Sequence, residues 1–110
     1  MKYGLQTNLP ATILRQFLEN AMPVISMFYG IIVHLYFEGN QRHKKPHIHV
    51  SYQNCEVVIS IPEGNVIEGE IPANKMKLVQ AWIEIHREEL IADWELAVSG
   101  QLPYKIEPLK

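Results

Sequence analysis

Cysteine is almost absent from this chain of 110 residues, since Cys55 is the only one. A single thiol cannot form an internal disulfide, which excludes a disulfide framework. No apolar run approaches the roughly 20 residues that span a bilayer, and the N-terminus lacks the basic and then apolar pattern of a signal peptide. These absences argue against a membrane protein and favour a cytoplasmic one.

An excess of basic residues is also missing: ten Lys and Arg stand against twelve Asp and Glu, for a formal net charge of −2. This balance argues against strong non-specific nucleic-acid binding, which depends on a basic surface. The local exception is the run Arg42-His43-Lys44-Lys45. We favour a solvated loop there, and the alternative is that Arg42, Lys44 and Lys45 hold a phosphate.

Signals of covalent chemistry are missing as well. No serine lies in a glycine-flanked elbow, no glycine-rich phosphate loop occurs, and no cysteine pair marks a zinc ribbon. Cys55 is expected on the core side of a strand, as a small apolar residue rather than a nucleophile. The sequence therefore contains no complete nucleophilic site.

Hydrophobic residues make up 47% of the chain and charged residues 20%, which suits one globular domain. We expect three parts: an N-terminal amphipathic helix extension in residues 1–21, a single α+β domain in 22–100, and an extended C-terminal tail in 101–110. The extension holds a helix over residues 9–20, whose apolar stripe is Leu9, Ile13, Leu14, Phe17 and Leu18. So short a helix is marginal alone and needs a packing partner.

The α+β domain is predicted to be an antiparallel meander of four or five strands over Val24 to Ile71, with one long helix, Lys75–Val98, packed on one face. Asn74 is the expected N-cap and Gly100 lies where the helix should end. The helix should bring five apolar residues to the core: Val79, Trp82, Ile83, Leu90 and Trp94.

Two predicted strands flank a two-residue turn at Gln53-Asn54, and this turn fixes a register. One face then pairs Tyr52 with Cys55, Val50 with Val57 and Ile48 with Ile59. The other face pairs Ser51 with Glu56, His49 with Val58 and His47 with Ser60. Aligning the preceding strand over Ile31 to Phe37 on the core adds its two polar-side residues, His34 and Tyr36, to this second, open face.

The motif Pro46-His47-Ile48-His49-Val50 carries the most suggestive chemistry. His47 and His49 lie on one side of a strand, roughly 6–7 Å apart by strand rise, and imidazole suits proton transfer or metal binding near neutral pH. They could act as acid and base on RNA in a ribonuclease or other phosphodiesterase. An exposed sheet face with these residues is as often a binding surface, with His34, Tyr36, Arg42, Lys44, Lys45, His47 and His49 as its candidates.

A second candidate cluster is His86, Glu89 and Asp93 on the long helix, within about 60° of one another by helical spacing. Glu89 could orient the imidazole of His86. The alternative, which we favour, is a buried histidine with acids that bind backbone donors of the tail or a loop.

No metal or cofactor is expected. The predicted helix covers the other side of the sheet, so His47 and His49 should face away from His86. A site of His34, His47 and His49 would be more plausible than one that reaches the helix, although absence of a metal is more plausible still.

Several motifs together resemble the bacterial family of the domain of unknown function 4160: Met22-Pro23-Val24-Ile25, then Pro46-His47-Ile48-His49-Val50, then Trp82 with His86-Arg87-Glu88-Glu89-Leu90 and Trp94-Glu95-Leu96-Ala97, and the tail residues 103–109. The resemblance covers residues 22–109 and leaves residues 1–21 as an extension. It implies a small protein of unknown activity, discussed as a toxin–antitoxin-type component beside a second small protein. It implies no catalytic residue.

From these observations we expect a small binding module in a two-gene regulatory pair. Its partner should be a second protein or a further copy of the chain. RNA is a possible partner, and no contact with a membrane is expected. The helix of residues 1–21 and the proline-bearing tail are the expected contact elements. The ribonuclease or phosphodiesterase remains the alternative.

Overall fold

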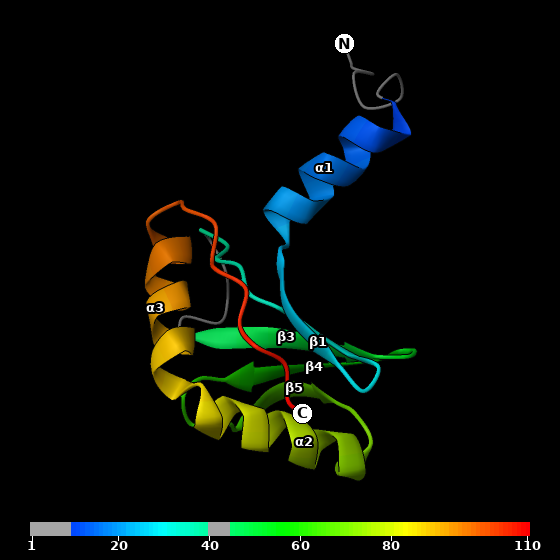
Figure 1. Cartoon of the computed structure of the whole chain (residues 1–110), viewed down its shortest axis with the longest axis vertical. Helices are drawn as coiled ribbons and strands as arrows, with labels where there is room; N and C mark the ends of the chain where they lie inside the picture. The colour runs from blue at the N-terminus through cyan, green and yellow to red at the C-terminus, as the bar shows by residue number, and fades with distance from the viewer. Residues whose placement is uncertain (1–9, 40–44) are drawn as a thin grey trace.

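The computed structural model describes residues 10–39 and 45–110, and the side chains of residues 16–20 lie outside the description. Its elements follow the predicted order of one short helix, a run of strands and a C-terminal helical region (Figure 1). The elements are α1 (Ala11–Ala21), β1 (Val24–Phe28), β2 (Ile31–His34), β3 (His47–Tyr52), β4 (Cys55–Ser60), β5 (Val66–Glu70), α2 (Ala73–Ile85) and α3 (Arg87–Val98).

The five strands form one antiparallel sheet in the order β1-β2-β3-β4-β5, so the predicted α+β meander is confirmed. The register predicted from the turn at Gln53-Asn54 is also confirmed, from Tyr52 opposite Cys55 to His47 opposite Ser60. Gln53 takes a positive φ of 54°, which a tight hairpin turn requires. The turn and the alternation of side chains therefore specify the same register for β3 and β4.

A second tight turn separates β1 from β2 at Tyr29 and Gly30, with φ values of 51° and 80°. Two successive positive φ angles match the right-handed twist of the strands that they join. β2 ends at His34, earlier than the predicted strand end at Phe37, so Leu35, Tyr36 and Phe37 lie beyond it. The alternation of residue types continues through this segment, so the sequence pattern marks neither the turn at Tyr29 and Gly30 nor the end of β2 at His34.

The predicted long helix is divided at His86, whose φ of −114° and ψ of 30° are not helical. The backbone hydrogen bonds nevertheless continue across it, because His86 N–H donates to Trp82 O (3.1 Å) and His86 O accepts from Leu90 N–H (2.9 Å). Helical periodicity survives such a break, which explains why the sequence predicted one helix. α2 begins after Pro72, so the expectation that Asn74 is the N-cap is wrong.

α3 ends as predicted beside Gly100, which has a φ of 86°. Gly100 N–H donates to Ala97 O (3.0 Å) and Gln101 N–H donates to Leu96 O (2.9 Å). These two bonds form the Schellman arrangement that closes a helix at a left-handed glycine.

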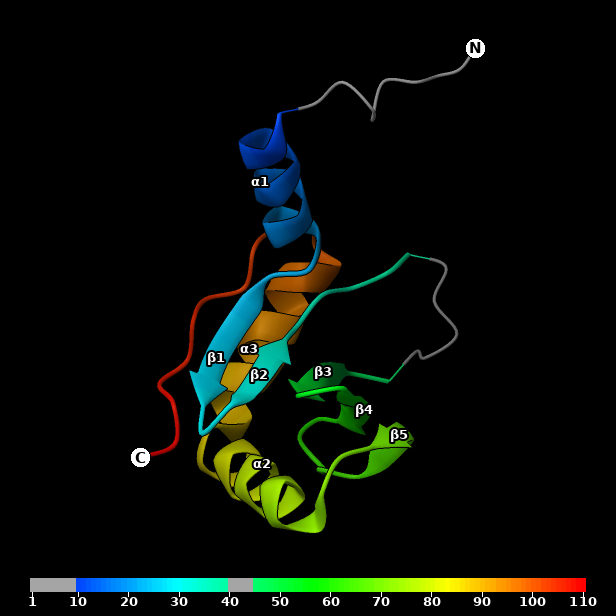
Figure 2. The same cartoon turned by 90° about the vertical axis from the view of Figure 1, so that its right-hand side faces the viewer.

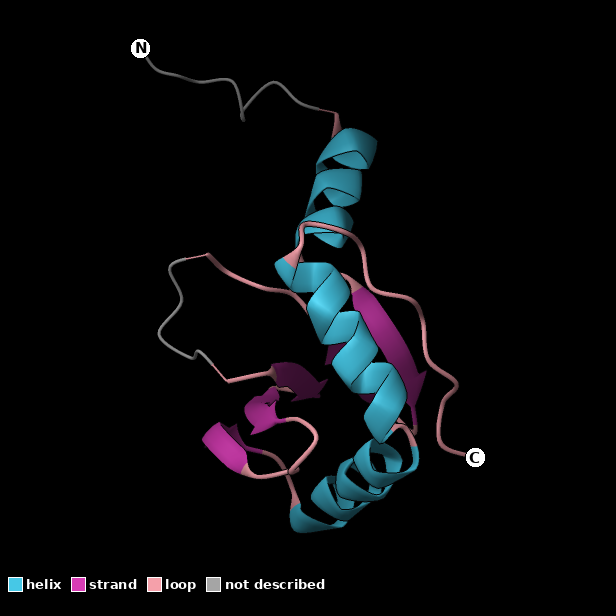
Figure 3. Ribbon diagram, turned by 90° about the vertical axis from the view of Figure 1, so that its left-hand side faces the viewer, coloured by secondary structure: helices cyan, strands magenta, loops and turns pink. Residues whose placement is uncertain are grey.

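Both C-terminal helices cover one face of the sheet, and Figures 2 and 3, taken from opposite sides, show α3 running alongside β1. The predicted core contribution of the helices is confirmed, because each of the five predicted residues is at most 7% exposed. These residues are Val79, Trp82, Ile83, Leu90 and Trp94.

Residues 101–110 contain no helix or strand and run back beside β1 (Figure 2). Ile106 is buried, and each of residues 104–107 makes one hydrogen bond to the rest of the domain. The bonds are Tyr104 N–H to Asp93 Oδ1 (2.9 Å), Lys105 Nζ to Val24 O (3.0 Å), Ile106 N–H to Ile25 O (2.8 Å) and Trp82 Nε1–H to Glu107 O (2.8 Å). The tail is thus an integral part of the domain.

None of the helices in residues 10–39 and 45–110 is long and apolar enough to cross a lipid bilayer.

Candidate functional site

β2 and β3 bring part of the predicted histidine cluster together. His34 and His49 are directly opposite each other in the sheet, and both are half-buried. The ring of Tyr36 stacks on that of His49, with centroids 4.4 Å apart and planes 12° apart. The ring of His47 meets His49 edge-on at 5.1 Å. The sheet therefore gathers His34, Tyr36, His47 and His49, as the alternation of residue types indicated.

Backbone carbonyls orient two of these imidazoles. His34 Nδ1 lies 2.9 Å from Met22 O, and His47 Nδ1 lies 2.7 Å from Lys45 O. A carbonyl oxygen only accepts, so in both rings Nδ1 carries the proton and donates it. In the neutral rings the second nitrogen, Nε2, then holds the lone pair, which is the form that a base or a metal ligand needs.

His47 is not on an open surface, which corrects the prediction that it faces away from the helix. Only 2% of it is exposed, and its ring lies 5.0 Å from that of Trp94 in α3. Its cross-strand neighbour Ser60 is fully buried, and Ser60 Oγ accepts a hydrogen bond from Asn65 N–H (3.1 Å). Alternation fixes the side of a strand, but His47 is the first residue of β3, which begins beside α3 (Figure 1), and there its ring contacts Trp94.

Burial raises the pKa of Tyr36, and the negative charges of Glu38 and Glu56 raise it further. Its phenol therefore stays protonated and available as a hydrogen-bond donor across the physiological range. Lys45 is exposed. Arg42 and Lys44, the other predicted phosphate contacts, lie outside the described residues.

The second candidate cluster separates into two parts. His86 Nδ1 donates to Glu89 Oε1, the contact expected from their spacing of three residues, and the His86 ring packs beside Trp82 at 5.6 Å. Asp93 is 2% exposed and holds the tail, since its Oδ1 accepts from Tyr104 N–H. Glu89 is thus a partner of His86, whereas Asp93 binds a backbone donor of the tail.

Asp93 carries an electrostatic cost, because its Oδ2 is buried without a hydrogen-bond partner among the described residues. Burial raises the pKa of its carboxyl; the Tyr104 N–H lowers it, and Glu89 raises it again, for a net rise. The native state therefore holds this proton at pH values where the unfolded chain has lost it.

We expect the free energy of unfolding to fall as pH rises from about 4, the ordinary aspartate value, through the raised native pKa of Asp93. Asp93→Asn removes this titration while its amide oxygen still accepts from Tyr104. Urea unfolding at several pH values should show the variant gaining on the wild type as pH rises. Glu88→Gln, on an exposed neighbour, is the control, and parallel pH profiles for Asp93→Asn and wild type would disprove the assignment.

No group of three or more His, Cys, Asp or Glu among the described residues is placed to hold a metal ion. Cys55 is exposed, which corrects its expected place on the core face. It lies at the hairpin turn, where the strand pair ends and no core layer covers its side chain.

Two contacts of Trp94 were not predicted from the sequence. Its ring lies beside that of His47, and Phe37 packs edge-on against it with ring centroids 5.7 Å apart. Helical spacing placed Trp94 in the core, but the position of a helix across a sheet depends on tertiary packing. Local sequence patterns therefore could not predict that the motif around His47 and the motif around Trp94 lie close together.

The sequence model of one family, described as a domain of unknown function (DUF4160), matches residues 30–95. The chain belongs to this family. The DUF4160 match covers more than half of the 110 residues and includes both candidate clusters, while α1, β1 and the tail lie outside it. No curated protein matches the chain. No solved structure matches it either.

Proposed function

We propose that this chain is a protein-binding module in a two-gene regulatory pair of the toxin–antitoxin type, located in the cytoplasm, and that α1 is its docking element. The observation that supports this proposal most strongly is the position of α1. It projects beyond the start of β1 and away from the sheet (Figures 2 and 3).

Apolar side chains of α1 and the residue that follows it are exposed to solvent. The exposed fractions are 53% for Ile13, 39% for Leu14 and 42% for Met22. A helix of 11 residues is marginally stable alone and gains stability by burying an apolar face. A partner protein that covers Ile13 and Leu14 supplies the buried contact that the rest of the described chain does not give these two side chains.

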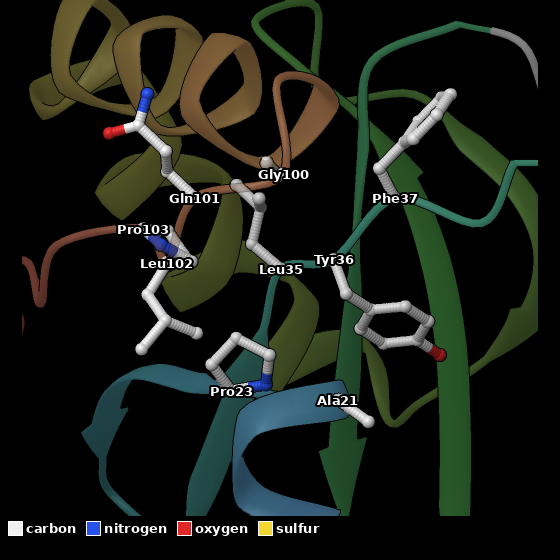
Figure 4. A pocket seen from close by; sticks show the side chains of 10 residues that line it. Ala21, Pro23, Leu35, Tyr36, Phe37, Gly100, Gln101, Leu102 and Pro103 are labelled. Carbon is white, nitrogen blue, oxygen red and sulfur yellow. The ribbon is translucent and has the colours of Figure 1, made fainter.

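Exposed apolar residues also occur on the body of the domain, next to the foot of α1. A pocket of about 160 Å³ lies at the foot of the helix, between Ala21 and Pro23 on one side and residues 100–103 on the other (Figure 4). Phe37 and Leu102 are 37% and 56% exposed beside it. A partner helix along α1 could therefore also contact Phe37 and Leu102.

The anchored tail is less suited to docking than expected, because its backbone and Lys105 already bond to the domain.

Substitution of Ile13 and Leu14 together by glutamate tests the role of α1. We expect co-expressed partner protein to be lost from the purified complex, with the melting temperature of the domain unchanged. Thr12→Glu/Gln16→Glu, which adds the same two negative charges outside the predicted apolar stripe, is the matched control and should retain the partner.

Retention of the partner by the Ile13→Glu/Leu14→Glu variant would disprove α1 as the docking element. The ribonuclease alternative is less well supported, since the burial of His47 keeps one of its two histidines from substrate. RNA cleavage by the purified chain that His49→Ala abolishes would favour that alternative over the binding module.

A further inference from the structure

A groove with a volume of about 460 Å³ runs between β1 and the tail, and it shares no lining residue with the pocket at the foot of α1. Residues 24–27 form one wall, residues 105–108 form the other, and Glu89 of α3 completes it. Figure 2 shows the tail passing beside β1. This volume lies within the range of small-molecule sites.

The groove is lined by charged side chains of both signs. Glu89 is an exposed carboxylate whose Oε1 accepts from His86 Nδ1 and whose second oxygen is not engaged by that bond. Lys105 Nζ donates to Val24 O, a neutral acceptor, which leaves its positive charge and further N–H donors available. The remaining carboxylate, Glu107, forms an ion pair with Lys110 at 3.6 Å.

The rest of the lining is apolar, with one exception. Ile25 and Ile106 are 1% and 4% exposed, and Met27 and Pro108 lie beside them. The exception is Ser26, which is 6% exposed and whose hydroxyl has no hydrogen-bond partner among the described residues. A buried hydroxyl without a partner costs free energy, and because this oxygen is closed to solvent, the ligand contacts come from the other lining residues.

We propose that this groove binds a free α-amino acid with an apolar side chain. Its carboxylate pairs with Lys105, its ammonium pairs with Glu89, and its side chain lies against Met27 and Pro108, the exposed apolar residues of the lining. A wholly apolar ligand would cover both charges and leave them unpaired, which is costly. A ligand with one charge would satisfy only one of the two.

Binding is tested with the full chain and L-leucine, followed by the backbone amide signals in NMR spectra. We expect shifts confined to residues 24–27, 89 and 105–107. Two analogues each lack one charge: 4-methylpentanoic acid has no ammonium, and 3-methylbutylamine has no carboxylate. N-acetyl-leucinamide, which has neither, represents a peptide segment, and all three should bind roughly tenfold more weakly or worse, as expected for losing a hydrogen bond to a charged group.

Variants then assign the contacts. Glu89→Gln retains an acceptor for His86, and Lys105→Met retains the aliphatic stem, and each should weaken leucine binding about tenfold. Glu88→Gln and Lys77→Met remove the same charges from exposed side chains outside the groove and should leave binding unchanged. The proposal is overturned if leucine shifts no groove amide at its solubility limit, or if N-acetyl-leucinamide binds as tightly as leucine. Equal binding by Glu89→Gln and wild type also overturns it.

Discussion

Replacing Trp94 by alanine is expected to lower the free energy of unfolding by about 3–5 kcal/mol, the usual cost of deleting a buried tryptophan side chain. Trp94 is 7% exposed and contacts two segments besides its own helix: Phe37, beyond the end of β2, and His47, at the start of β3. Its removal leaves a cavity where α3 meets this end of the sheet. The same change should open His47 to solvent.

Urea unfolding of the purified variant, followed by circular dichroism, measures this cost. Trp94→Phe is the control, because it keeps an aromatic ring in the contact and should cost less than the alanine variant. A Trp94→Ala protein as stable as wild type would contradict the packing of α3 on the sheet.

Replacing Trp82 by alanine should also cost about 3–5 kcal/mol, since its side chain is fully buried against Phe28 with ring centroids 5.4 Å apart. Trp82 has a second role, because its Nε1–H donates to Glu107 O and so anchors the tail. Trp82→Phe keeps most of the apolar volume but leaves that carbonyl without its donor. We expect this milder variant to cost about 1–3 kcal/mol.

Limited proteolysis distinguishes the two roles of Trp82. The Trp82→Phe protein should be cleaved faster in residues 101–110 than wild type, while the sheet and helices retain their circular dichroism signal. Unchanged cleavage of the tail would show that the Trp82 hydrogen bond does not hold it in place.

Patterns of neighbouring residues in the sequence predicted the fold correctly where two such patterns agreed. The turn at Gln53-Asn54 and the alternation of residue types both specify the register of β3 and β4, and this register is confirmed residue by residue. The helical stripe likewise identified Trp82 and Trp94 as core residues. Such patterns depend on neighbours in the sequence, which is why they can be read without a structure.

Local rules failed where a distant segment decides the outcome. His47 has the alternation of an open-face residue, yet Trp94, 47 positions later, covers it. The break at His86 leaves the helical period intact, so no pattern marks it. For the candidate site, spacing predicted the neighbours His34, His49 and Tyr36 and the contact of His86 with Glu89, whereas which of them would be accessible depended on tertiary packing.

Native mass spectrometry of the untagged chain, expressed with its neighbouring gene and purified, tests most directly whether this is a protein-binding module. We predict a complex that contains the chain and a second protein, and the loss of that complex when Ile13 and Leu14 are replaced by glutamate. A wild-type chain that is alone and monomeric over a wide range of concentration would contradict the proposed function.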